Sequence, residues 1–328
     1  MNKHSEEYNK MKKIKVRPMH LLSTLVVCVL VIFATDFGVR MMNPRSLIDA
    51  IEEHGCFVPV GGVKKDLPTL VSGEEGEIPS SAGTVAEPGC TSKAVTQDDI
   101  FKGRLVPYRG DMQVIPDVSE SSVNLSQYKN NYYTTLGEEM PLTKDAADGF
   151  NALMEAYNKA TDLVDFAVYG TEVTNNGVGS PCPIPFSESK AGNSIDLAVM
   201  GYGSIISYDG LDAEKWVIDN CHNYGYVVRY PQNKAEITGE QYCPWHIRYV
   251  GIPHSMVMKS NNWCLEEYIG YLRSFTRDNP FLCSVNDRNY EIYSVPSMGE
   301  VTYLSVPLAG NYEISGDGTT GYIITIEK

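Results

Sequence analysis

An uncharged stretch near the N-terminus is the feature that most restricts how this chain can be placed and folded. No Asp, Glu, Lys or Arg occurs from Pro18 to Thr35, and six basic residues against two acidic ones precede it in residues 1–18. As a helix, these 18 residues would be about 27 Å long, close to the roughly 30 Å hydrocarbon core of a bilayer. The pattern predicts a cytoplasmic tail at 1–18 and a transmembrane anchor at 19–35.

The same stretch could be a cleaved signal peptide, a lipoprotein signal or the leader of a secreted form. Cleavage before Thr35 would need small side chains at Ala34 and at position 32, where the sequence has Ile32. Cys28 lies too deep in the apolar run for a lipidation site. An uncleaved anchor fits best, so we expect a single-pass protein of the cell membrane whose bulk lies outside the cytoplasm.

The charge balance excludes one broad class of partner. The chain has 27 Lys and Arg against 41 Asp and Glu, a net charge of −14, and its basic tail leaves the remainder still more acidic. A body this acidic is not expected to bind nucleic acid or anionic wall polymers.

The cysteines give no metal or redox motif. Seven follow the anchor, an odd number that leaves at least one without a disulfide: Cys56, Cys90, Cys182, Cys221, Cys243, Cys264 and Cys283. None shows the CxxC spacing of a zinc ribbon or a thioredoxin-like site. Their pairing stays open at this stage.

The rest of the chain divides into three parts. Residues 36–100 are rich in Gly, Pro, Ser and Glu and lack an apolar period, which indicates a stalk or linker. Residues 101–283 mix strand-like and helix-like segments without a regular alternation, which indicates an α+β domain. Residues 284–328 are strand-like pieces between Pro and Gly turns, which indicates a small C-terminal β appendage.

Periodicity places the elements of the α+β domain. We expect strands at 165–172, 195–201, 226–231 and 245–251, and helices at 143–157, 213–223 and 263–275. Thr143 and Asp212 are the expected N-caps of the first two helices. The apolar face of the first helix holds Ala146, Phe150, Leu153, Met154 and Tyr157.

Alternation along the strand at 245–251 separates its side chains into two groups. His246, Arg248 and Val250 should share one face of the sheet. Trp245, Ile247 and Tyr249 should share the other.

Three ordered blocks resemble the VanY-type zinc D-alanyl-D-alanine carboxypeptidases of Gram-positive bacteria. These blocks are SESKAGNSID at 187–196, YGYVVRYP at 224–231 with ITG at 237–239, and CPWHIRYVG at 243–251. The resemblance extends from about residue 100 to the C-terminus and implies a D-Ala-D-Ala carboxypeptidase-like (LAS-type) α+β domain. Such enzymes trim D-alanine from peptidoglycan stem peptides, using one zinc held by His, Asp and His and a Glu as general base.

The residues that define this chemistry are only half present. The family's first block runs S-x-H-x-x-G-x-A-x-D, so Asp196 keeps a ligand position and Ser189 stands where the first histidine ligand belongs. The last block runs E-P-W-H, so His246 keeps a ligand position and Cys243 stands at the general base. Glu172 falls about where the family has an Arg that grips the substrate's carboxylate, which would reverse the charge of that clamp.

We therefore expect a catalytically degenerate member, with zinc absent or weakly bound, that binds a peptidoglycan stem peptide or an envelope protein. Zinc sites normally take three or four protein ligands, and loss of a general base costs about 10²- to 10⁴-fold in rate. Two alternatives stay open. One is an active zinc D,D-carboxypeptidase with Asp196, Cys243 and His246 as ligands, and the other is a structural module of a surface assembly.

Cys243 has two further interpretations. It could be a small buried thiol that fills the space of the missing carboxylate, or a nucleophile assisted by His246. The second lacks any sign of an oxyanion hole.

Other residues near the motifs are assigned more ordinary roles. Lys190 could neutralise Asp196 in the absence of metal, but a solvated surface lysine is the simpler interpretation. Arg229 and Arg248 match family arginines and are expected to brace the structure and border the cleft. His222 is expected on a helix surface, His254 in a loop, and the tryptophans in the core: Trp216, Trp245 and Trp263.

Overall fold

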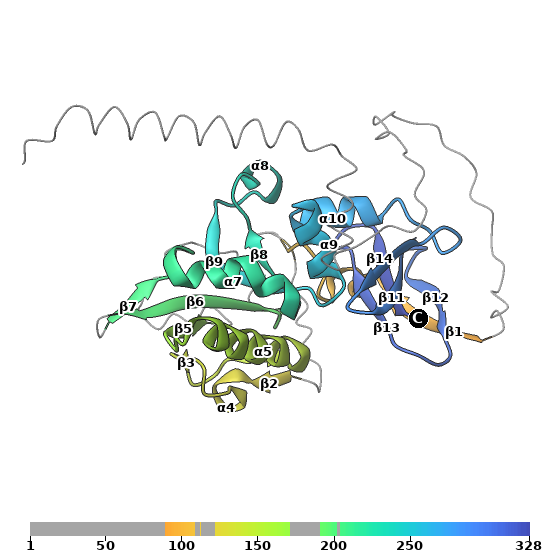
Figure 1. Cartoon of the computed structure of the whole chain (residues 1–328). Coiled ribbons are helices and arrows are strands. Elements are labelled where there is room, and N and C mark those ends of the chain that lie inside the picture. The colour runs from red at the N-terminus through yellow and green to blue at the C-terminus, as the bar shows by residue number, and fades with distance from the viewer. Residues whose placement is uncertain (1–88, 109–111, 113–121, 171–190, 202–203) are drawn as a thin grey trace, which may run out of the picture. The chain divides into compact units, whose positions relative to one another are not determined.

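The computed structural model describes residues 89–108, 112, 122–170, 191–201 and 204–328 (Figure 1). The predicted tail, anchor and most of the stalk lie outside these residues. Among the helices within them, none combines the length and the apolar character needed to cross a bilayer.

The described chain is a mixture of strands and helices, as expected for an α+β fold. The strands up to the end of the peptidase-like part are β1 (Cys90–Thr96), β2 (Ser122–Asn124), β3 (Thr134–Thr135), β4 (Pro141–Thr143), β5 (Phe166–Gly170), β6 (Ser194–Gly201), β7 (Ser204–Ser207), β8 (Tyr226–Tyr230) and β9 (Cys243–Tyr249). The C-terminal strands are β10 (Phe281–Val285), β11 (Arg288–Pro296), β12 (Val301–Pro307), β13 (Tyr312–Gly316) and β14 (Gly321–Glu327). The α-helices are α4 (Leu125–Tyr128), α5 (Lys144–Thr161), α7 (Lys215–Asn220), α8 (Ala235–Thr238), α9 (His254–Asn261) and α10 (Leu265–Leu272). Three 3₁₀ turns are η1 (Gln97–Phe101), η2 (Asp212–Glu214) and η3 (Cys221–Tyr224).

A central sheet positions the residues of the family motifs. Its strand order is β3-β5-β6-β9-β8, with β7 paired to β6 as a further strand. Helix α5 lies against β5 and β6 in Figure 1 and closes one face of this sheet. The apolar side of β9 faces this core, where Ile247 is buried and Trp245 and Tyr249 pack at its border, as alternation predicts.

Helix α5 forms as its periodicity predicts and extends four residues further. All five predicted face residues are buried. Gly149 lies on the same helix, at a position where a Cβ would sit only 2.6 Å from the carbonyl oxygen of Tyr224. The glycine weakens the helix by about 1 kcal/mol relative to alanine but allows η3 to approach it closely.

The two predicted N-caps differ from what the structure shows. Thr143 does occupy the N-cap position of α5, but its hydroxyl bonds Asn193 Oδ1 at 2.9 Å instead of the helix backbone. This bond ties the start of α5 to the residue before β6. Asp212 is not a cap: it is the first residue of η2, with a φ of 51°.

The opposite face of the sheet packs on α9, α10 and the C-terminal strands. One buried cluster joins Val227 of β8, Leu265 and Ile269 of α10, and Ile292 and Ile323 of β11 and β14. The C-terminal sheet has the order β10-β11-β14-β13, as the predicted β extension implies.

The predicted part boundaries need two corrections. Strand β1 pairs with β12 from Cys90↔Pro307 to Thr96↔Val301, so ordered structure begins within the segment assigned to the linker. Strand β10 crosses the boundary at 283/284. The partner of β1 lies more than 200 residues away in the chain, whereas β10 pairs with β11 across a short turn.

Candidate functional site

The two retained ligand positions lie side by side on the central sheet. Asp196 of β6 and His246 of β9 are directly opposite in the antiparallel ladder. His246 Nδ1 and Asp196 Oδ1 are 2.7 Å apart, and the imidazole is fully buried. An ionised carboxylate can only accept a hydrogen bond, so in that state Nδ1 donates. The other ring nitrogen, Nε2, is buried and has no hydrogen-bond partner among the described residues.

At their present separation, His246 Nδ1 and Asp196 Oδ1 are too close for both atoms to ligate one tetrahedral zinc ion. Two ligand atoms at about 2.1 Å from a tetrahedral zinc lie about 3.4 Å from each other. The Asp196 and His246 atoms are closer than this, at 2.7 Å, and are joined by a hydrogen bond. Over the part of the chain that the structure describes, no three His, Cys, Asp or Glu side chains come together as a metal-binding group.

The proposed ligand trio can be tested directly because all three residues are described. Cys243 is fully buried and forms a small apolar cluster with Tyr230, bordered by Trp245. It is not brought together with Asp196 and His246 as a metal-binding group.

An arginine and an aromatic ring hold His246 in place from β8. The Tyr230 ring stacks on the His246 ring at a centroid distance of 5.5 Å. The Arg229 guanidinium lies 4.7 Å from the Tyr230 centroid and pairs with Glu266 of α10 through two bonds, of 2.7 and 3.0 Å. Arg229 is 1 % exposed, so the expectation that it is a structural brace agrees with its geometry.

Arg248 braces a different segment. It is fully buried, its guanidinium donates to the carbonyl of Arg104 at 3.3 Å, and it lies 5.2 Å from the ring centroid of Tyr108. Tyr108 in turn packs with Val106 and Ala191, the residue that leads into β6. Arg248 therefore fixes residues 103–108 beside the motif strands.

Two residues near Asp196 were not identified from the sequence. Tyr169 of β5 has a raised pKa, caused first by burial and then by the negative charge of Asp196. Ser194, which stands where the family block has Ala, has a buried hydroxyl without a partner among the described residues. The departure at Ser194 was readable from the motif, whereas nothing in the sequence signals Tyr169.

Several residues that the sequence analysis singled out lie in surroundings other than predicted, or lie outside the described residues. Glu172, Ser189 and Lys190 lie outside the described residues. His254 is not in a loop but is the first residue of α9. Its buried ring forms hydrogen bonds with Tyr268 and Thr325. His222 is on η3 with its Nδ1 buried, and burial lowers its pKa to about 4, so it is not a simple surface histidine. The tryptophans are at core borders and only partly buried: Trp216, Trp245 and Trp263.

Comparison with known proteins places this arrangement in a family. The family model described as "VanY: D-alanyl-D-alanine carboxypeptidase" matches residues 182–252, which include both Asp196 and His246. A D-alanyl-D-alanine carboxypeptidase of Enterococcus faecium is 32% identical over 245 residues, covering 71% of this chain and 78% of that protein. The chain belongs to the D-alanyl-D-alanine carboxypeptidase family.

Solved structures of this family agree with the fold. The vancomycin-resistance D,D-dipeptidase VanXYg, solved with a D-Ala-D-Ala phosphinate analogue, aligns with a TM-score of 0.60 at 23% identity. The match covers 73% of this chain and 99% of VanXYg, so the carboxypeptidase-family fold takes in most of the described residues. A VanY variant from a VanB-type cassette, solved with Zn(II), aligns at 23% identity with a TM-score of 0.34 and covers 42% of this chain and 88% of that one.

Proposed function

We propose that this protein is a membrane-anchored, extracytoplasmic member of the D-alanyl-D-alanine carboxypeptidase family that binds peptidoglycan stem peptides without hydrolysing them. The observation that carries the proposal is the direct 2.7 Å hydrogen bond between Asp196 and His246. Two side chains that would hold a metal in an active relative instead form a hydrogen bond with each other through His246 Nδ1 and Asp196 Oδ1.

The substituted positions support the same conclusion. Ser189 offers no imidazole, and Cys243 offers no carboxylate to take a proton from water. The buried, apolar surroundings of Cys243 favour the interpretation of a thiol that fills space. The scaffold around them is retained, because Arg229 pairs with Glu266 and Arg248 bonds the carbonyl of Arg104 beside the motif strands.

The ligand class follows from the family. VanXYg was solved with an analogue of D-Ala-D-Ala, and a chain with the same fold can keep the peptide groove after losing the chemistry. The uncharged run at 18–35 supports placement at the outer face of the membrane, where stem peptides occur.

The test combines metal content, turnover and binding on the full-length chain in detergent. We expect less than one zinc per chain by elemental analysis, no D-alanine release from a stem pentapeptide, and saturable binding of that peptide. Release of D-alanine that Asp196→Ala abolishes would contradict the proposal and favour the enzyme with an altered ligand set.

A restoring variant makes the test sharper. Ser189→His combined with Cys243→Glu rebuilds the family pattern around Asp196 and His246. We expect this double variant to bind one zinc per chain and to gain D-alanine release, whereas Cys243→Glu alone should gain neither. A folded double variant that binds zinc no better than the natural chain would mean that more than these two positions has diverged.

A further inference from the structure

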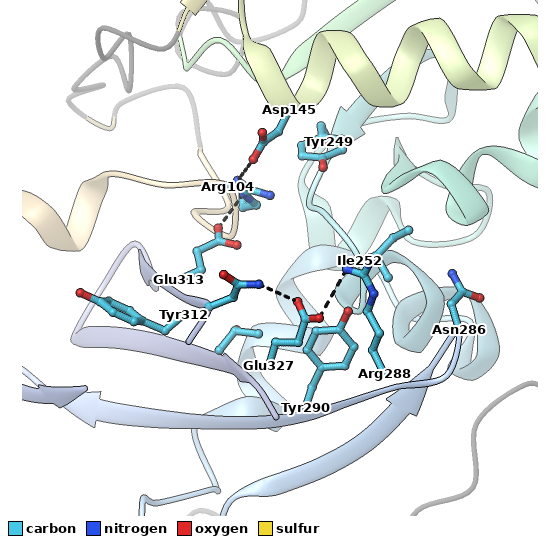
Figure 2. Close-up of a pocket in the computed structure, with 12 residues that line it drawn as sticks. Arg104, Asp145, Tyr249, Ile252, Asn286, Arg288, Tyr290, Tyr312, Glu313 and Glu327 are labelled. Carbon is cyan, nitrogen blue, oxygen red and sulfur yellow. Dashed lines mark hydrogen bonds and ion pairs between the residues drawn. The ribbon is translucent and has the colours of Figure 1, made fainter. Parts of the chain in front are cut away.

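A second candidate site lies apart from the Asp196 and His246 pair. A pocket of about 600 Å³ opens between the start of α5, the end of β9 and the C-terminal sheet, and neither Asp196 nor His246 lines it (Figure 2). We call it the Arg104 pocket. Its lining residues are Arg104, Asp145, Tyr249, Ile252, Asn286, Arg288, Tyr290, Asn311, Tyr312, Glu313, Thr325 and Glu327.

The cations of the pocket are already neutralised. Arg104 bonds Glu313 at 2.6 Å and Asp145 at 2.9 Å. Arg288 lies 3.5 Å from Glu327. Two arginines against three carboxylates leave the pocket slightly negative. An anionic ligand would have to compete with these carboxylates for the guanidinium groups.

Uncharged side chains make up the rest of the lining, and among its tyrosines Tyr312 is the exposed ring. Figure 2 shows Tyr312 at one end of the pocket, Asn286 at the other, and Tyr290 between them. Tyr312 is 39% exposed and has no ring partner among the described residues. The side chain of Asn286 likewise has no hydrogen bond within the described parts of the chain. An amide of this kind presents a donor and an acceptor side by side, which suits neighbouring hydroxyl groups.

We propose that the Arg104 pocket binds a neutral saccharide. Paired charges and amides can exchange hydrogen bonds with ring hydroxyls, and the open Tyr312 ring can cover the apolar face of a sugar. A volume of about 600 Å³ is within the usual range of small-ligand sites.

The first test is calorimetry of the full-length chain with three trisaccharides. One is built from N-acetylglucosamine, one is cellotriose, which is neutral without acetamides, and one is trigalacturonate, which is acidic. We expect a neutral trisaccharide to bind and trigalacturonate not to. No binding of either neutral probe up to about 10 mM, or tighter binding of trigalacturonate, would overturn the proposal.

Variants locate the binding. Tyr312→Ala and Asn311→Ala should each weaken neutral-sugar binding by about tenfold, the effect of losing one good contact. Tyr303→Ala is the matched control, because Tyr303 is 64% exposed on β12 and does not line the pocket. Equal affinity in all three variants would show that the sugar binds elsewhere and would overturn the assignment.

A charge variant tests why the ligand is neutral. Glu313→Gln with Glu327→Gln removes two carboxylates and leaves Arg104 and Arg288 in excess over Asp145. We expect this double variant to gain at least about tenfold in affinity for trigalacturonate. Neutral-sugar binding without such a gain would contradict the role given to charge compensation.

Discussion

At the scale of single residues, the site is defined by which polar groups find a partner. Asp196 bonds Nδ1 of His246, whose buried Nε2 has no partner among the described residues, and Arg229 bonds Glu266 twice. Both pairs are almost completely buried, where an unpaired charge costs much more than at the surface. The retained motif residues therefore lie in a buried, largely hydrogen-bonded network.

The Arg229 pair gives the first prediction. Glu266→Gln removes the carboxylate that faces a guanidinium with no exposed surface, so it should lower the free energy of unfolding by about 3–5 kcal/mol. Urea denaturation followed by circular dichroism measures this loss. The matched control is Glu155→Gln, which breaks an exposed pair with Lys159 and should change stability by less than about 1 kcal/mol. Similar losses in both variants would mean that burial does not set the strength of the Arg229 pair.

Sequence reasoning succeeds for residues on one strand and fails for partners far apart. Alternation on β9 put His246 and Arg248 on the same face, and the motif pointed to Asp196, because both patterns are local. Glu266 belongs to a helix 37 residues after Arg229, so no local pattern could pair them. For the same reason, no local pattern indicated Tyr108 as the aromatic partner of Arg248.

At the scale of elements, α9 and α10 connect the central sheet to the C-terminal strands. His254 begins α9, its Nδ1 lies 2.8 Å from the Tyr268 hydroxyl of α10, and its Nε2 lies 3.2 Å from Thr325 of β14. The sequence predicted α10 approximately but missed α9. The segment after β9 is a predicted loop, whereas the structure begins α9 there at His254.

The buried histidine gives a pH prediction. Burial, with a smaller contribution from the positive charge of Arg104, lowers the pKa of His254 to about 3 in the folded protein, whereas an unfolded chain has about 6.5. Between these pH values the unfolded state binds more protons than the folded state. The contribution of the neutral His254 to the free energy of unfolding is therefore full above about pH 6.5 and is lost as the pH falls toward 3.

The expected effect is a difference between two proteins at two pH values. From pH 7 to pH 5, the natural chain should lose about 1–2 kcal/mol more stability than His254→Gln, which keeps polar contacts but does not titrate there. Urea denaturation at both pH values measures the difference. His222, whose pKa burial lowers to about 4, acts in the same direction in both proteins and therefore cancels. Parallel pH dependence in both would contradict the buried neutral state of His254.

At the scale of the whole described chain, the C-terminal β extension shares a buried core with the main fold. Ile323 of β14 packs in the same cluster as Leu265 and Ile269 of α10 and Val227 of the central sheet. Arg273, just after α10, bonds Asp317 at 2.8 Å. The composition of residues 284–328 predicted strands correctly, but it could not reveal that their apolar faces cover α10.

This shared core predicts that the two parts unfold together. Ile323→Ala should lower the free energy of unfolding by about 2–5 kcal/mol through loss of buried surface and the cavity left behind. Leu308→Ala, at a position 71% exposed, is the matched control and should have little effect. All three tryptophans lie before residue 284, so their fluorescence reports only on the peptidase-like part. If the core is shared, Ile323→Ala shifts the fluorescence transition and the circular dichroism transition by the same amount. A fluorescence midpoint that stays in place while circular dichroism divides into two steps would show that the C-terminal sheet unfolds independently, and that the contacts of Ile323 with α10 contribute little to the stability of the site.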